Sequence, residues 1–202
     1  MNWYESDVKA AIAKREACIY EPETVFYGSS TFTLWPDIDA DFSEFKPVNL
    51  GFGGSTLTAC LEFFERIVTP VKKPQRFLLY AGDNDLGDGA SAHQVLSLYL
   101  QLKNKVRQHY GDIPFYYISI KPSLLRFKII ERIKQTNLLI SNQIKLSGGN
   151  DFFINTYDSM LDEKGHPQKR FFEADDLHLN EQGYDVWREA ILNELAFSTQ
   201  LM

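Results

Sequence analysis

The sequence predicts an α/β protein built on a parallel five-stranded sheet. Short apolar segments, rich in aromatic and β-branched residues, alternate along the chain with longer segments of helical periodicity. Within the short segments apolar and polar residues hardly alternate, which is typical of strands that helices cover on both faces. The 202 residues suffice for one domain with a full hydrophobic core, and no linker or repeat interrupts them. We therefore expect residues 1–202 to form a single domain.

The five strands follow from the composition of the short segments. Thr24–Tyr27 and the shorter Val48–Leu50 each run directly into a glycine-containing loop. Phe77–Tyr80 is the third strand, again followed at once by a polar loop. Phe115–Ile120 has the strongest β character, because aromatic and β-branched residues dominate it. Phe152–Asn155 completes the predicted sheet.

The helices follow from apolar stripes that recur every three or four residues. The expected helices are Ser6–Cys18, Thr56–Val68, Ala92–Tyr110, Phe127–Leu146 and Glu181–Ala196. In the third of them, for example, one stripe carries Val95, Leu98, Leu102 and Val106. Asn180, directly before the last helix, is a suitable N-cap residue.

Composition and charge narrow the classes of function. The net charge of −6 argues against nucleic acid as a partner, because phosphate binding requires a basic face. No apolar run approaches the roughly 20 residues of a membrane span, and the polar start of the chain does not resemble a signal peptide. Cys18 and Cys60 lack metal-like spacing and are expected to be small buried side chains rather than a disulfide. These features favour a cytoplasmic protein.

Four polar motifs stand where predicted strands end or the last helix begins. They are Gly28-Ser29-Ser30, Gly51-Phe52-Gly53-Gly54-Ser55-Thr56, Gly82-Asp83-Asn84-Asp85 and Asp175-Asp176-Leu177-His178. In an open parallel sheet, ligands bind beyond the carboxyl ends of the strands. The first three motifs follow strands one to three, so we expect them to converge at one edge of the sheet. This layout is typical of an active site.

The first motif offers a serine nucleophile. Taken alone, Gly-Ser-Ser more often marks a turn or a helix N-cap. A strand-to-helix turn at Ser30, however, exposes the hydroxyl and directs its backbone N–H toward an oxyanion, and the hydroxyl attacks once a nearby base accepts its proton. Ser29 is the competing nucleophile. The motif is not the G-x-S-x-G elbow, because Phe32 occupies the second glycine position.

The second and third motifs offer oxyanion donors. Gly51 to Thr56 fails the dinucleotide pattern G-x-G-x-x-G, which leaves a helix start whose N–H groups, especially that of Gly54, can bind an anion. Asn84 can donate its side-chain amide to the same oxyanion. A rival interpretation, metal binding by Asp83, Asp85 and Asp88, matches a calcium loop poorly.

The fourth motif offers a general base. A carboxylate three residues before an imidazole can fold back onto its Nδ1–H, which fixes the tautomer and leaves Nε2 facing the serine. The pair is therefore Asp175 and His178, with Asp176 as the alternative carboxylate.

Together the four motifs resemble the SGNH hydrolases, also called the GDSL lipase/esterase family. The four conserved blocks of that family would correspond here to Ser30, Gly54, Asn84 and His178. The first block, with Trp35 behind it, resembles a subgroup that has Gly-Ser-Ser in place of Gly-Asp-Ser. The resemblance implies a flavodoxin-like three-layer αβα sandwich without a metal or an organic cofactor. It also implies an oxyanion hole formed by the N–H groups of Ser30 and Gly54 and by the Asn84 amide.

The expected activity is hydrolysis of a small-molecule carboxylic ester by a Ser30–His178–Asp175 triad. A sugar O-deacetylase, a thioesterase and a non-catalytic ligand-binding module on the same fold are the alternatives. Phe32, Trp35 and Phe127 are candidates for pocket walls, although aromatics in such positions are as often part of the core. Lys121 and Arg126 are candidates for binding an anionic substrate, although solvated surface charge is the more common role of such residues. The sequence does not indicate the oligomeric state.

Overall fold

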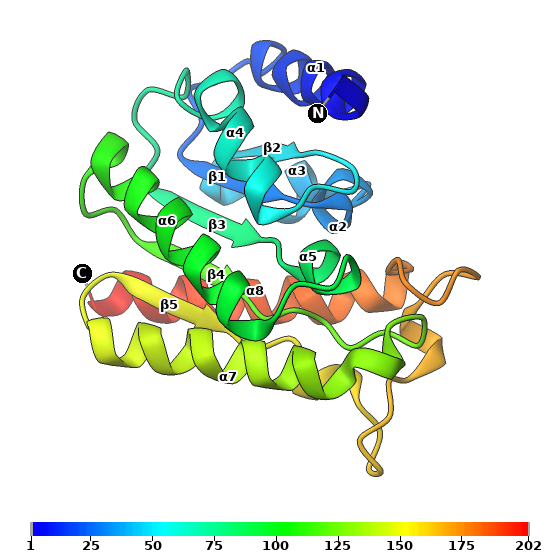
Figure 1. Ribbon diagram of the computed structural model, residues 1–202. Helices are drawn as coiled ribbons and strands as arrows, with labels where there is room; N and C mark the ends of the chain where they lie inside the picture. Colours follow the sequence, from blue (N-terminus) through cyan, green and yellow to red (C-terminus); the bar gives the residue numbers. More distant parts are fainter. Residues whose placement is uncertain (1, 202) are drawn as a thin grey trace.

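The computed structural model describes residues 2–201 and contains a five-stranded parallel sheet in the order β2-β1-β3-β4-β5 (Figure 1). The strands are β1 (Thr24–Gly28), β2 (Pro47–Gly51), β3 (Arg76–Tyr80), β4 (Phe115–Ile118) and β5 (Asp151–Ile154). The predicted α/β class and all five strands are confirmed. The fourth strand ends at Ile118 rather than at Ile120, because the side chain of Asn137 bonds to both backbone polar groups of Ile120.

Helices cover both faces of the sheet and make a three-layer sandwich (Figure 1). One face packs against α1 (Glu5–Glu16), α4 (Leu57–Ile67), α6 (Ala92–Tyr110) and α7 (Ile130–Ser147). The other face packs against α2 (Ser30–Thr33), α3 (Ile38–Asp41) and α8 (Glu181–Leu201). Within residues 2–201, no helix combines the length and apolar character needed to cross a membrane.

The sheet has a hydrophobic core on each face, and successive residues of a strand belong alternately to one core and the other. In β1, Val25 and Tyr27 belong to the core under α1, α4, α6 and α7, whereas Phe26 belongs to the core under α2, α3 and α8. This period of two, with both faces apolar, explains why the strands show no polar alternation in the sequence. Both cysteines are free; Cys60 is buried in the first core and Cys18 is half-buried.

Side-chain caps mark the starts of α4, α6 and α8. Thr56 Oγ1 accepts a hydrogen bond from the Ala59 N–H at 3.2 Å, and Ser91 forms a capping box with Gln94. Asn180 Oδ1 accepts from the Gly183 N–H at 3.1 Å, the contact expected of the predicted N-cap. The predicted helix Ala92–Tyr110 has the observed bounds, whereas the predicted Phe127–Leu146 starts as a 3₁₀ turn, Phe127–Ile129, before α7.

Further short elements were not predicted from periodicity. Besides α2 and α3 they comprise α5 (Asp83–Gly87) and the 3₁₀ turns Asn2–Tyr4, Ser43–Phe45, Asp158–Met160 and Lys169–Phe171. Elements of three to five residues are too short for a helical period to appear in the sequence.

The strand order favours a ligand site between β1 and β3. In the order 2-1-3-4-5 the chain reverses its direction of winding at this pair, and open α/β sheets bind ligands outside the carboxyl ends of such strands. Figure 1 shows α2, α5 and the start of α8 at this end of the sheet. The first and third polar motifs, and the loop with the fourth motif just before α8, therefore lie at the same end of the sheet.

Candidate active site

Backbone contacts hold the loops after β1, β2 and β3 together. The Ser29 N–H donates to the Tyr80 carbonyl at 3.0 Å, and the Phe52 N–H donates to the Gly28 carbonyl at 2.9 Å. Gly28 has a φ of +142°, and a Cβ there would clash with the Tyr80 carbonyl, so the first motif requires glycine at this position. The three loops therefore converge at one edge of the sheet, as predicted.

The side chains of Ser30 and His178 contact each other. Ser30 is the first residue of α2, and its Oγ lies 3.1 Å from His178 Nε2. Ser29 has the extended backbone of an N-cap residue and is only 2% exposed, so its hydroxyl is not accessible to a substrate. The Tyr184 hydroxyl of α8 donates to the Thr31 carbonyl at 3.0 Å and holds α8 against α2.

Asp175, rather than Asp176, contacts the imidazole. Asp175 Oδ2 lies 2.5 Å from His178 Nδ1, and Oδ1 accepts from the backbone N–H groups of Leu177 and His178. Asp176 adopts a left-handed backbone with φ +62°, and its carboxylate pairs with Lys169. Because of the left-handed backbone at Asp176, the two neighbouring carboxylates bind different partners.

The same contacts keep Asp175 ionised. Its partial burial raises the pKa, but the hydrogen bonds from the backbone and ring of His178 and from the Leu177 N–H outweigh burial and lower the pKa to about 2. A carboxylate that is charged at every physiological pH favours the His178 tautomer with its proton on Nδ1. The Nε2 atom then has a lone pair directed at Ser30.

Gly54 lies in the loop after β2, and Asn84 lies at the start of α5 after β3. Gly54 has a φ of +65°, and its carbonyl accepts from the Tyr4 hydroxyl at 3.1 Å. Asn84 is the second residue of α5, and its Nδ2 donates to the Ser55 carbonyl at 3.0 Å. The amide of Asn84 is therefore tied to the loop that carries Gly54.

The two cations expected at the surface are instead part of the site. Lys121 is only 2% exposed, and its Nζ donates to Thr31 Oγ1, Tyr80 OH and Asp83 Oδ2 at 3.1–3.2 Å. Arg126 Nη2 donates to Asn84 Oδ1 at 3.1 Å. The interpretation as solvated surface charges is wrong because both side chains reach inward to partners. The available signal was a lysine directly after the strongest strand, at the edge that carries Asp83.

The predicted aromatic wall is present only in part: Trp35, although nearly buried, borders a hollow beside α8. Phe32 and Trp35 are 0% and 3% exposed and belong to the core between α2, α3 and α8. Phe127 is 41% exposed and is the one residue of the three that presents its ring to solvent. The periodic apolar spacing behind Ser30 thus serves the packing of α2.

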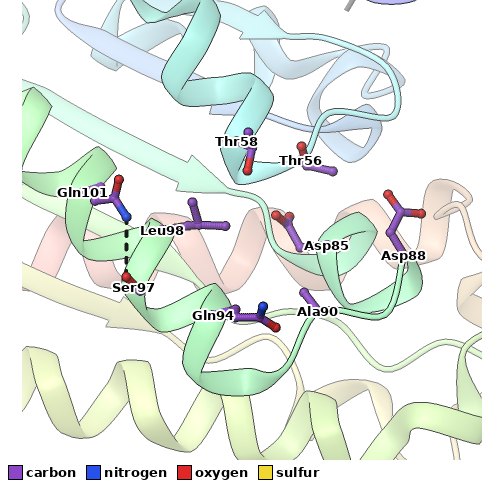
Figure 2. Close-up of a pocket in the computed structure, with 9 residues that line it drawn as sticks. All are labelled: Thr56, Thr58, Asp85, Asp88, Ala90, Gln94, Ser97, Leu98 and Gln101. Carbon is purple, nitrogen blue, oxygen red and sulfur yellow. Dashed lines mark hydrogen bonds between the residues drawn. The ribbon is translucent and has the colours of Figure 1, made fainter.

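Asp83 and Asp85, considered above as metal ligands, have other partners. Asp83 forms ion pairs with Lys121 and with Arg126, at 3.2 and 2.8 Å. Both carboxylate oxygens of Asp85 accept from the Leu57 N–H, at 3.0 and 3.1 Å, and so cap α4 from across the chain. Asp85 also lines a hollow of about 470 Å³ between the starts of α4 and α6 (Figure 2). Neither Ser30 nor His178 lines this hollow.

The buried position of Asp85 makes folding depend on pH. Burial raises the pKa of Asp85 to about 6, although the bond from Leu57 works in the opposite direction. The folded protein therefore keeps this proton up to about pH 6, whereas the unfolded chain releases it near the ordinary value of 3.8. Since the folded state binds more protons in this window, raising the pH from 4 to 7 lowers the stability.

We expect the free energy of unfolding of the wild-type protein to fall by up to about 3 kcal/mol relative to that of Asp85→Asn over this pH window. Urea denaturation of both proteins at several pH values measures the difference. Glu62→Gln, an exposed change on α4 outside the groups that shift the Asp85 pKa, is the control and should follow the wild type closely. Parallel stability curves for wild type and Asp85→Asn would contradict the expectation.

Comparisons with known proteins identify the family. A model of the GDSL-like lipase/acylhydrolase family matches residues 24–186. A search of curated proteins found no match. Among solved structures, a Streptococcus pneumonia protein described as a candidate platelet activating factor has a TM-score of 0.83 at 20% identity, over 96% of this chain and 95% of its own.

Two further structures have the same fold. A GDSL-like lipase from Bacteroides thetaiotaomicron has a TM-score of 0.78 at 19% identity, over 96% of this chain and 98% of its own. A carbohydrate esterase family 3 protein from Talaromyces cellulolyticus has a TM-score of 0.72 at 14% identity, over 89% and 99%.

The parallel sheet and the family match define the chain as a hydrolase that acts on ester bonds. It belongs to the GDSL-like lipase/acylhydrolase family, because the family model spans all five strands and the four polar motifs up to the start of α8.

Proposed function

We propose that the protein is a serine esterase in which Ser30, His178 and Asp175 form the catalytic triad. The observation that carries the proposal is the continuous chain of contacts from Ser30 Oγ through the His178 ring to Asp175. A carboxylate, an imidazole and a hydroxyl in this order are the arrangement in which an imidazole activates a serine.

In the proposed mechanism, Nε2 of His178 accepts the hydroxyl proton as Ser30 Oγ attacks the ester carbonyl. The C–O double bond opens, and the tetrahedral oxyanion is bound by the N–H groups of Ser30 and Gly54 and by the Asn84 amide. The His178 imidazolium then gives its proton to the leaving alcohol, and the acyl group remains on Ser30. Water, deprotonated by His178, hydrolyses the acyl-enzyme and restores the free serine.

An acetylated sugar is the second candidate substrate class. Phe32 and Trp35 are buried in the core, so they do not form an apolar channel for a long acyl chain. The structurally similar protein from Talaromyces cellulolyticus is a carbohydrate esterase, which supports the same substrate class.

The free thiols of Cys18 and Cys60 support our expectation that the protein works in a reducing, cytoplasmic compartment.

Hydrolysis of p-nitrophenyl esters from acetyl to decanoyl tests the proposal. We expect turnover with the highest kcat/KM at the shortest chains, because the buried aromatics offer no acyl channel. An optimum at long chains would replace the deacetylase candidate with a lipase-like pocket. Turnover of thioesters alone would indicate a thioesterase, and a folded protein without turnover on any of these substrates would favour the binding module.

A further inference from the structure

A buried cluster of charges lies directly behind Asn84. The Asp83 carboxylate pairs with the Lys121 ammonium at 3.2 Å and with Arg126 Nε at 2.8 Å. The side chains of Asp83 and Lys121 are 5% and 2% exposed, and that of Arg126 is 18% exposed. Their formal charges sum to +1, so the cluster places a net positive charge at this edge of the sheet.

The cluster is built into the backbone around it. A Cβ on Gly87, at the end of α5, would occupy the position of the Arg126 guanidinium, so glycine leaves the space that this side chain fills. Burial lowers the pKa of Lys121, but Tyr80 and Asp83 outweigh burial and raise it, so the amine stays charged. Since apolar residues often stabilise a core as well as buried ion pairs do, the cluster calls for an explanation beyond stability.

The contact between Arg126 and Asn84 fixes the direction of the amide. A guanidinium has only donors, so the group of Asn84 that faces it must be the acceptor, Oδ1. The NH₂ group then points the other way, where one hydrogen is donated to the Ser55 carbonyl. The second hydrogen is left for a further acceptor, and the loop that carries Gly54 lies on this side. A positive donor on Oδ1 also polarises the amide and strengthens its N–H groups as donors.

We propose that Arg126 is the positioning residue that makes Asn84 an oxyanion donor, with Asp83 and Lys121 holding Arg126 in place. The inference rests on the proposed function, because it assigns a supporting residue to the proposed oxyanion hole. Arg126 acts only through Asn84 and does not contact the substrate. Lys121 Nζ also donates to Thr31 Oγ1, and Thr31 is the neighbour of Ser30. The same cluster therefore connects Asn84, the proposed oxyanion donor, to the segment that carries the proposed nucleophile.

A double-mutant cycle of Arg126→Met and Asn84→Ala tests the inference. On a short p-nitrophenyl ester, Asn84→Ala should lower kcat by about 10²- to 10³-fold. Arg126→Met should lower kcat by about 10- to 100-fold, with KM changed less than about threefold, because only the transition state uses the second amide hydrogen. The double variant should be no slower than Asn84→Ala, because Arg126 has no effect without the amide.

Matched variants separate positioning from folding. Arg132→Met removes a neighbouring arginine that reaches the Leu86 and Ala90 carbonyls of the same region but not Asn84, and its kcat should stay near that of the wild type. Arg126→Lys retains the charge and should keep the fold if Arg126→Met does not. Arg126→Lys should restore only part of kcat, because a single ammonium group cannot bind both Asp83 and Asn84 in the way that the two nitrogens of the guanidinium do.

Multiplicative losses in the double variant, or a wild-type kcat in both Arg126 variants, would overturn the inference. In either case a Ser30→Ala protein without turnover would leave the proposed triad standing. An active Ser30→Ala protein would instead overturn the proposed function, and the inference with it.

Discussion

Ser30→Ala should lower kcat for an ester substrate by about 10⁶-fold, the loss seen when a serine hydrolase loses its nucleophile. The reason is that, among the side chains that the structure describes, only the Ser30 hydroxyl bonds to His178 Nε2, with its Oγ 3.1 Å away. The Ser30 side chain is half-buried and the change removes a single oxygen, so the free energy of unfolding should change by about 1 kcal/mol or less.

Ser29→Ala is the matched control for this variant. Ser29 takes part in the structure mainly through its backbone, whose N–H binds the Tyr80 carbonyl, and alanine preserves that contact. We expect Ser29→Ala to retain kcat within a few-fold. The reverse pattern, an active Ser30→Ala protein and an inactive Ser29→Ala protein, would transfer the role of nucleophile to Ser29.

Asp175→Asn should lower kcat by about 10⁴-fold, as the corresponding change does in serine proteases. An amide can donate to His178 Nδ1, which would place the ring proton on Nε2 and remove the lone pair that Ser30 requires. The two backbone N–H bonds to Oδ1 can persist in the variant, so the turn and the fold should survive.

Asp176→Asn provides the comparison that separates the neighbouring aspartates. Asp176 pairs with Lys169 at the surface, and an exposed pair of this kind contributes little to stability. We expect this variant to keep nearly the full kcat of the wild type. Steady-state kinetics of both variants at pH 8 measures the difference, and equal losses of activity would show that the turn, rather than the Asp175 carboxylate, is what matters.

The sequence was sufficient to predict the sheet because each strand is a short, uniformly apolar segment. The same logic misplaced the end of the fourth strand, since Ile120 is apolar but bonds to the side chain of Asn137. The helix α2 has only four residues, so no period could reveal it. Phe32 and Trp35 appeared as pocket residues because position alone does not tell which side of a short helix packs on the core.

Some residues of the candidate site could be proposed from the sequence and others could not. Ser30 and Asn84 could be proposed from the sequence because each stands in a short motif just after a predicted strand, and His178 because Asp175 lies three residues before it. Lys121 and Arg126 could not, because their partners lie about 40 residues away in the sequence and long cationic side chains are usually solvated. Their burial becomes visible only when the partner loops are in place.

The measurement that tests the triad most directly is labelling by a fluorophosphonate, which bonds covalently only to an activated serine. Mass spectrometry of the digested wild-type protein should locate one phosphonyl group on Ser30, and the folded Ser30→Ala protein should not react. His178→Ala should react far more slowly, because the base that activates the serine is gone. A folded wild-type protein that does not react, or that carries the label on another serine, would contradict the proposed triad.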